Sequence, residues 1–152
     1  MTDTIYDALR ESHEIQRSLC RKLLRAKPGE QRREELLRQL RIELAAHAAA
    51  EERYLYAPIL MDDMGLSASR HALSEHLEID ERVKELEGAS SDGDSWLARA
   101  RKLSEEVHHH LKEEEKKFFQ TSGKILSDVQ KKKLAGQYRK DYARMLRTLA
   151  DE

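Results

Sequence analysis

An internal repeat constrains the fold of this chain more than any other feature of its sequence. Residues of the same chemical kind recur 63 positions apart, and they are His13/His76, Leu23/Leu86, Leu40/Leu103, Glu43/Glu106, Leu44/Val107, His47/His110 and Glu51/Glu114. Self-similarity at one offset indicates a duplicated supersecondary unit. Since both copies carry apolar residues at helical spacing, the repeat predicts two helical hairpins that pack face to face about an approximate two-fold axis.

Helix start and stop signals divide the sequence into five predicted helices. They span residues of about 4–27, 30–60, 67–88, 95–123 and 127–149. Thr4 with Asp7, and Ser127 with Gln130, have the spacing of N-terminal capping boxes. Pro58 is expected to weaken the last turn of the second helix. No segment shows the alternation that is typical of a strand, so the chain is predicted to be all-α.

Apolar stripes and short connections predict how these helices pack. Core-facing positions in the second and third helices are Leu36, Leu37, Leu40, Leu44, Ile79, Val83 and Leu86. Short connections favour antiparallel neighbours. We therefore expect a single domain over residues 1–152, with an up-down-up-down four-helix bundle over about 4–123 and an additional C-terminal helix over about 127–149. That last helix is amphipathic, so it should pack outside the bundle or against a partner.

Charge and composition exclude several classes of protein. The chain has 28 basic and 29 acidic residues, a formal net charge of -1, which gives no attraction to nucleic acid or to anionic membranes. No apolar run approaches the roughly 20 residues that a membrane span needs. The lone cysteine, Cys20, cannot form an internal disulfide and is interpreted as a small core residue. We expect a cytoplasmic protein with no nucleic-acid or membrane partner, and the sequence identifies no protein partner.

Candidate metal ligands come from four His-x-x-x-Glu pairs, which are His47/Glu51, His71/Glu75, His109/Glu113 and His110/Glu114. Residues at i and i+4 share one face of a helix and can reach one metal ion. The 63-residue offset selects the first and last pair, together with two further histidines. The predicted metal ligands in the bundle interior are therefore His13, His47, Glu51, His76, His110 and Glu114. Imidazole with carboxylate suits iron, and also manganese or zinc.

The remaining polar residues near these positions have less certain roles. His71, His108 and His109 are expected on the surface. Glu43 and Glu106 lie one turn before ligand histidines, where they either hydrogen-bond an imidazole or form ordinary helix charge pairs. The alanines around His47, at positions 45, 46 and 48–50, either leave room for a small ligand or allow close helix packing.

These motifs together resemble the hemerythrin-like family of HHE cation-binding domains. The matching segments are ESHEI at 11–15, ELAAHAAAEERYLYAP at 43–58, EHLEI at 75–79 and HLKEEEKKFF at 110–119. The resemblance covers about residues 5–120. It implies a carboxylate-bridged centre of two non-haem irons, with Glu51 and Glu114 as the bridges. By symmetry, His13 and His47 would serve one iron and His76 and His110 the other. Glu115 is the alternative to Glu114 as the second bridge.

The sequence departs from the oxygen-carrying hemerythrins at two positions. Where their third helix supplies a second histidine, this chain has Ala72. Where their fourth helix has an aspartate, this chain has Glu114 and Glu115. One fewer imidazole leaves more open coordination, which favours redox chemistry with oxygen or peroxide over dedicated oxygen carriage.

Three functional hypotheses follow. The first is a non-haem di-iron protein that binds, senses or reacts with a small molecule such as oxygen, nitric oxide or peroxide. The second is a di-iron oxidase or catalase-like enzyme that uses the same site. The third is an iron-reserve or structural helical bundle. The sequence alone does not separate the first two, because no signalling or redox domain is attached.

Overall fold

The computed structural model describes residues 2–152, and every regular element in that range is helical. The elements in chain order are α1 (Ile5–Arg25), α2 (Gln31–Glu51), η1 (Glu52–Tyr56), α3 (Ala57–Leu60), α4 (Leu66–Glu87), α5 (Trp96–Glu113), η2 (Glu114–Phe118), α6 (Phe119–Ile125) and α7 (Asp128–Ala150). The two η elements are single π-helical turns. They join their neighbours into continuous rods, so that α2–η1–α3 and α5–η2–α6 each act as one long helix.

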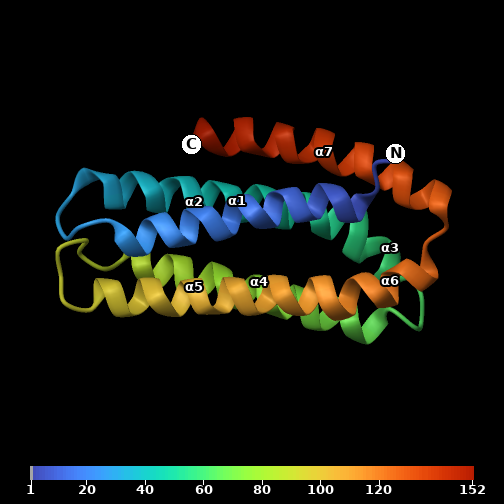
Figure 1. Ribbon diagram of the computed structural model, residues 1–152, viewed down its shortest axis with the longest axis horizontal. Coiled ribbons are helices and arrows are strands. Elements are labelled where there is room, and N and C mark those ends of the chain that lie inside the picture. The colour runs from blue at the N-terminus through green and yellow to red at the C-terminus, as the bar shows by residue number, and fades with distance from the viewer. Residues whose placement is uncertain (1) are drawn as a thin grey trace.

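The rods form an up-down-up-down four-helix bundle, as the sequence predicts (Figure 1). Helix α7 is the additional C-terminal helix. It packs along α1 and α2, on the side of the bundle away from α4 and α5 (Figure 1). Of the two placements that the sequence allows for this helix, the structure therefore has the first. Among the described residues, no helix is long and apolar enough to cross a membrane.

Local signals determine the helix ends closely. Thr4 with Asp7 forms the capping box of α1, and Ser127 with Gln130 forms that of α7. Gly65 directly precedes α4, and a Cβ there would lie 2.4 Å from the backbone oxygen of Ile59. Only glycine fits such a close approach between chain segments.

Two apolar clusters fill the two ends of the bundle. One contains Leu23, Leu40, Leu86 and Leu103, and the other contains Ile5, Leu9, Leu55 and Ile59, all almost fully buried. Cys20 lies in the first cluster, where burial raises the pKa of its thiol to about 12 and makes it unreactive. Between the clusters, every rod carries buried polar residues, so the molecule has a polar layer across its middle.

The π-helical turns lie at matching places in the repeat. η1 follows directly after Glu51, and η2 begins at Glu114. Pro58 lies just after the first turn, but the second has no proline nearby, so proline is not their shared cause. Sequence analysis predicts continuous helices here and misses both turns. Such π-bulges occur frequently at functional sites.

Candidate metal centre

The structure brings all six predicted ligands together in the polar layer. They form two overlapping groups, within each of which one ligand atom per residue lies within 4.8 Å of the others. One group is His13, His47, Glu51 and Glu114, and the other is Glu51, His76, His110 and Glu114. Both carboxylates belong to both groups, and each group holds the two histidines of one hairpin.

Each shared carboxylate lies between an imidazole of its own hairpin and one of the other. Oε1 of Glu51 is 3.1 Å from Nε2 of His47 and 3.2 Å from Nε2 of His76. Glu114 has its Oε1 3.2 Å from Nε2 of His13 and its Oε2 3.5 Å from Nε2 of His110. A carboxylate so placed can bridge two cations.

The outer nitrogens of two histidines bond across the bundle to a second pair of repeated glutamates. Nδ1 of His76, on the second hairpin, lies 2.8 Å from Oε2 of Glu52 on the first. Nδ1 of His13, on the first hairpin, lies 2.7 Å from Oε2 of Glu115 on the second. Glu52 and Glu115 are themselves 63 residues apart. In both copies, therefore, the first of two consecutive glutamates enters the centre and the second orients a histidine.

The other two histidines have different outer partners. Nδ1 of His110 lies 2.9 Å from Oε1 of Glu75 on α4. Nδ1 of His47 lies 2.7 Å from the hydroxyl of Tyr138 on α7, which is also 2.7 Å from Oγ of Ser12. All four imidazoles are thus held through Nδ1 and turn Nε2 inward. Such bonds fix the tautomer and the orientation of a metal-binding histidine.

The inward-facing atoms lack hydrogen-bond partners. Nε2 of His13, His47 and His110, both oxygens of Glu51 and Oε1 of Glu114 are buried with none. Leaving a buried polar atom unpaired costs roughly 1–3 kcal/mol, and more if it is charged. Six such atoms converging from three of the four rods would be costly to bury without a cation. The donor set therefore fits a metal centre, since a cation would satisfy these lone pairs.

Without metal, the centre retains protons. Burial alone would lower the pKa of His13 and His76, but hydrogen bonds to glutamates outweigh it and raise these pKa values to about 9 and about 10. Burial dominates at His47 and lowers its pKa to about 4. Burial and the nearby charge of Glu51 raise the pKa of Glu114. In the metal-free protein, protonated His13 and His76 therefore supply the positive charge beside the carboxylates of Glu51 and Glu114.

Tyr56 borders the centre on the side of the second hairpin's histidines. Its buried hydroxyl donates a short hydrogen bond to Glu114 and lies 3.4 Å from Nε2 of His76. Burial, with the charges of Glu114 and Glu51, raises the pKa of Tyr56 well above its usual value. The phenol therefore stays protonated and is a proton donor in direct contact with the site.

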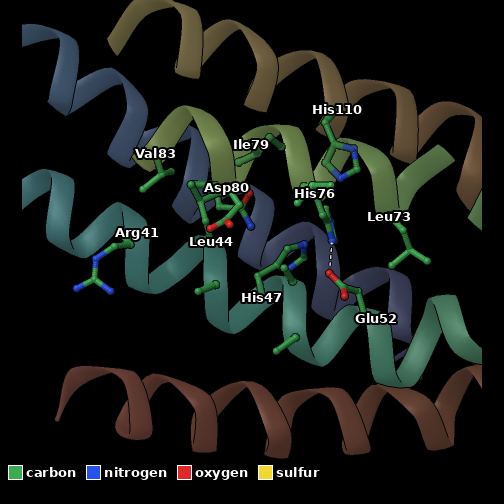
Figure 2. A pocket seen from close by; sticks show the side chains of 15 residues that line it. Arg41, Leu44, His47, Glu52, Leu73, His76, Ile79, Asp80, Val83 and His110 are labelled. Carbon is green, nitrogen blue, oxygen red and sulfur yellow. Dashed lines mark hydrogen bonds and ion pairs between the residues drawn. The ribbon is translucent and has the colours of Figure 1, made fainter. Parts of the chain in front are cut away.

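A cavity of about 370 Å³ leads to the same centre. It lies between α2 and α4 and is bordered by His47, His76 and His110 (Figure 2). Small side chains make this room, because Ala45, Ala48 and Ala49 line it. These three alanines therefore agree with the first alternative for the alanine-rich segment, that its small side chains leave room for a small ligand. Ala46 and Ala50 are fully buried and fit close packing instead.

The comparisons with known proteins agree with this geometry. The sequence model of the hemerythrin HHE cation-binding domain matches residues 4–121. The chain belongs to this family. Its fold matches the crystal structure of a hemerythrin HHE cation-binding domain-containing protein from Mycobacterium kansasii, with a TM-score of 0.86 and 20% sequence identity over 95% of this chain and 88% of that one. No curated protein matches the chain.

Sequence analysis names Glu115 as an alternative bridge and Glu75 as part of a His-x-x-x-Glu pair, but it predicts no orienting role for several residues that contact the centre of this HHE domain. They are Glu52, Tyr56, Glu75, Glu115 and Tyr138. The signal for Glu52 and Glu115 was present, because both recur at the same offset as the ligands. The other three have no polar counterpart of their own kind in the other hairpin. Nothing in the local sequence therefore distinguishes them from ordinary core or surface residues.

The structure also shows where the nearby residues outside the predicted ligand set lie. His71 and His109 are exposed, as expected, with 57% and 70% of their side chains accessible. His108 is only half exposed, because its Nδ1 lies 2.8 Å from the backbone oxygen of Ser104. Glu43 bonds to Tyr142 of α7, and Glu106 pairs with Arg82. Among the described residues, neither glutamate bonds to a histidine of the centre. Glu106 follows the charge-pairing alternative, whereas Glu43, bonded to a tyrosine hydroxyl, follows neither alternative. Ala72 lies buried in the apolar cluster beside α3.

Proposed function

We propose that this hemerythrin HHE domain is a non-haem di-iron protein that binds or reacts with a small molecule such as oxygen, nitric oxide or peroxide. The proposed ligands are His13 and His47 for one iron, His76 and His110 for the other, and Glu51 and Glu114 as bridges. The observation that carries the proposal is the set of six buried, inward-facing atoms without hydrogen-bond partners.

The donor set supports iron with open coordination positions. Each group offers two imidazoles and two carboxylate oxygens, one more carboxylate than the 2-His-1-carboxylate sites of oxygen-activating iron proteins. When bound, two irons would supply one-electron redox chemistry and free positions for a small ligand. The substitution of Ala72 for a further imidazole is consistent with such free positions.

The chain's own residues support access by a small molecule. The cavity between α2 and α4 reaches the edges of His47 and His76. Gln16 also lines it, and the amide nitrogen of Gln16 is buried without a hydrogen-bond partner. That amide is positioned to donate to a molecule or water in the cavity. A purely structural role would not require an open path to the centre, so the cavity disfavours that role.

A second candidate function is a peroxide-consuming, catalase-like enzyme. The protonated hydroxyl of Tyr56 favours it, because reduction of peroxide requires a proton at the departing oxygen. The hydroxyl contacts Glu114 and lies 3.4 Å from Nε2 of His76, so the proton donor lies beside the proposed ligands of the second iron. Oxygen binding alone would not need this group. For either function we propose a cytoplasmic location, which suits the unpaired, buried Cys20.

Metal analysis tests the proposed cofactor. Protein expressed with ample iron and purified anaerobically should retain two irons per chain after a brief chelator wash that removes weakly held surface ions. One zinc per chain with negligible iron would overturn the di-iron proposal.

Stopped-flow absorbance of the reduced protein then separates the two candidate functions. A stable, reversible oxygen or nitric oxide adduct supports binding or sensing. Many turnovers of hydrogen peroxide per chain support the enzyme. Absence of both, in protein that holds two irons, would leave the iron-reserve role.

A further inference from the structure

Two His-x-x-x-Glu pairs supply no proposed ligand to the buried centre, although Glu75 contacts Nδ1 of His110 from outside it. His71 and Glu75 lie one turn apart on α4, and His109 and Glu113 lie one turn apart on α5. The two helices are neighbours in the bundle, and the structure brings the pairs together on their outer surface. This cluster of four residues is called the α4–α5 cluster below.

The four side chains of the α4–α5 cluster converge. Nε2 of His71 lies 3.2 Å from Glu113 and 3.5 Å from Glu75. Nε2 of His109 lies 3.1 Å from Glu113 and 4.0 Å from Glu75. His71, Glu75 and Glu113 each offer one ligand atom within 4.8 Å of the others, and His109 adds an imidazole through Glu113. Two nitrogen and two carboxylate donors are a set that first-row divalent cations bind.

The cluster is not a product of the internal repeat. The positions 63 residues earlier are Ala8, Ser12, Ala46 and Ala50. All four are buried, and Ser12 bonds directly to Tyr138 of α7. On the first hairpin this face is thus composed of small residues beneath a helix. On the second hairpin the same face is uncovered and carries two imidazoles and two carboxylates instead.

The surroundings of the cluster favour a cation. A cavity of about 250 Å³ adjoins Glu75 and His109, and Glu78, Glu105 and Glu106 also line it. Both histidines are more than half exposed and can be reached from solvent.

We infer that His71, Glu75, His109 and Glu113 form a second, surface site for a divalent transition-metal cation, and that Zn²⁺ is the ion it suits. Zinc accepts mixed imidazole and carboxylate ligands in tetrahedral geometry. The alternative is a network of ion pairs with no metal. Ion pairs this exposed contribute little to folding stability. The two alternatives are therefore distinguished by whether the cluster binds zinc, and not by the stability of the protein.

Zinc titration of the iron-loaded protein tests the site. Calorimetry at pH 7.5, with iron and zinc counted in the same sample by elemental analysis, should give about one zinc per chain with the iron retained. His71→Ala and His109→Ala should each weaken zinc binding at least about tenfold, because losing a ligand should cost no less than losing a ligand's hydrogen-bonding partner. His108→Ala is the matched control, since this histidine is adjacent in sequence but bonded to Ser104, and it should bind zinc like the unaltered protein. Binding should also weaken as the pH falls towards 5.5, because protons compete for the imidazoles.

The outcomes distinguish this inference from the di-iron proposal. No bound zinc, or zinc binding that is unchanged in the His71→Ala/His109→Ala double variant, would overturn the surface site. Neither result would bear on the iron count, which is measured separately and depends on other residues. Zinc uptake accompanied by an equal loss of iron, and unaffected by the double variant, would place the zinc in the buried centre and overturn the surface site as well.

Discussion

The two sides of the buried centre have the same ligands but different support. On one side, Nδ1 of His110 bonds to the carboxylate of Glu75. On the other, the residue equivalent to Glu75 is Ser12, which bonds instead to Tyr138, and the tyrosine reaches Nδ1 of His47. A phenol from α7 thus replaces a carboxylate from the bundle. The repeat preserves the atoms that face the centre and the glutamates that hold His13 and His76, whereas the partners of His47 and His110 have diverged.

A second difference lies at the rings that cover the histidines. The ring of Tyr56 is centred 5.1 Å from that of His76, and its counterpart Phe119 is stacked 6.1 Å from that of His13. Only the tyrosine has a hydroxyl, and it donates to Glu114. The second hairpin's histidines therefore have both an ionised partner and a proton donor. If two irons bind as proposed, they are chemically inequivalent, and four predictions separate what the two sides share from where they differ.

The largest loss of iron is expected from changes to the two carboxylates that both sides of the centre share. Glu51 and Glu114 belong to both ligand groups, so replacing either with alanine should lose at least one iron per chain. His108→Ala is the control and should retain both. The measurement is iron content after anaerobic purification. Full occupancy in Glu114→Ala would show that the wrong carboxylate is assigned, with Glu115 as the substitute.

Tyr56→Phe gives the first hairpin the side chain that the second already has at Phe119. Iron content should be unchanged, since Tyr56 is not among the proposed ligands. Peroxide turnover should fall by roughly 10²-fold, the lower end of what a positioned proton donor contributes. Phe119→Tyr is the reciprocal variant and should leave turnover near its original value. Turnover unaffected by Tyr56→Phe would remove the observation that favours a catalase-like enzyme.

Tyr138→Phe tests the support of the first hairpin. Loss of its hydroxyl leaves Ser12 and Nδ1 of His47 without their hydrogen bonds, which should cost roughly 1–3 kcal/mol of folding stability. Iron affinity should fall by about 10-fold to 100-fold, the effect expected when the partner of a metal-binding histidine is removed. Tyr142→Phe, on the same helix but bonded to Glu43, is the control. Equal iron affinity in both variants would mean that α7 does not position His47.

The smallest effect concerns pH and the metal-free protein. The folded-state pKa values of His13 and His76, about 9 and about 10, exceed the unfolded value of 6.5. Their contribution to stability is therefore fully present below about pH 6.5 and is lost as the pH rises through 9 and 10. Thermal unfolding should show the metal-free Tm falling by roughly 5–10 °C between pH 7 and pH 10.

The iron-loaded protein is the comparison for that titration. Its Tm should be higher throughout, because metal that binds only the folded state stabilises it. It should also change less over this range, since iron replaces the protons at Nε2. Identical melting curves for the two forms would contradict a buried metal centre.

Sequence analysis succeeded where signals are local or repeated. The capping residues Thr4 and Ser127 mark helix starts because a cap acts within one turn. The six central residues were found because the 63-residue offset separates them from the many other glutamates and histidines. Tyr138 could not be found in this way. Its role depends on how α7 lies across α1 and α2, and that placement is decided by long-range packing. The π-helical turns were missed because they have no local sequence signature.

The exchange of glutamates between the hairpins has a consequence for how such a centre can arise. Glu52 holds the histidine of the second hairpin, and Glu115 holds that of the first. His76 and His13 are therefore each oriented by the opposite hairpin, an arrangement that two identical copies could provide for each other. The centre has the form of a symmetric homodimer joined into one polypeptide. A single hairpin, used twice, would suffice to specify all six central residues, and joining two copies would free each half to change independently.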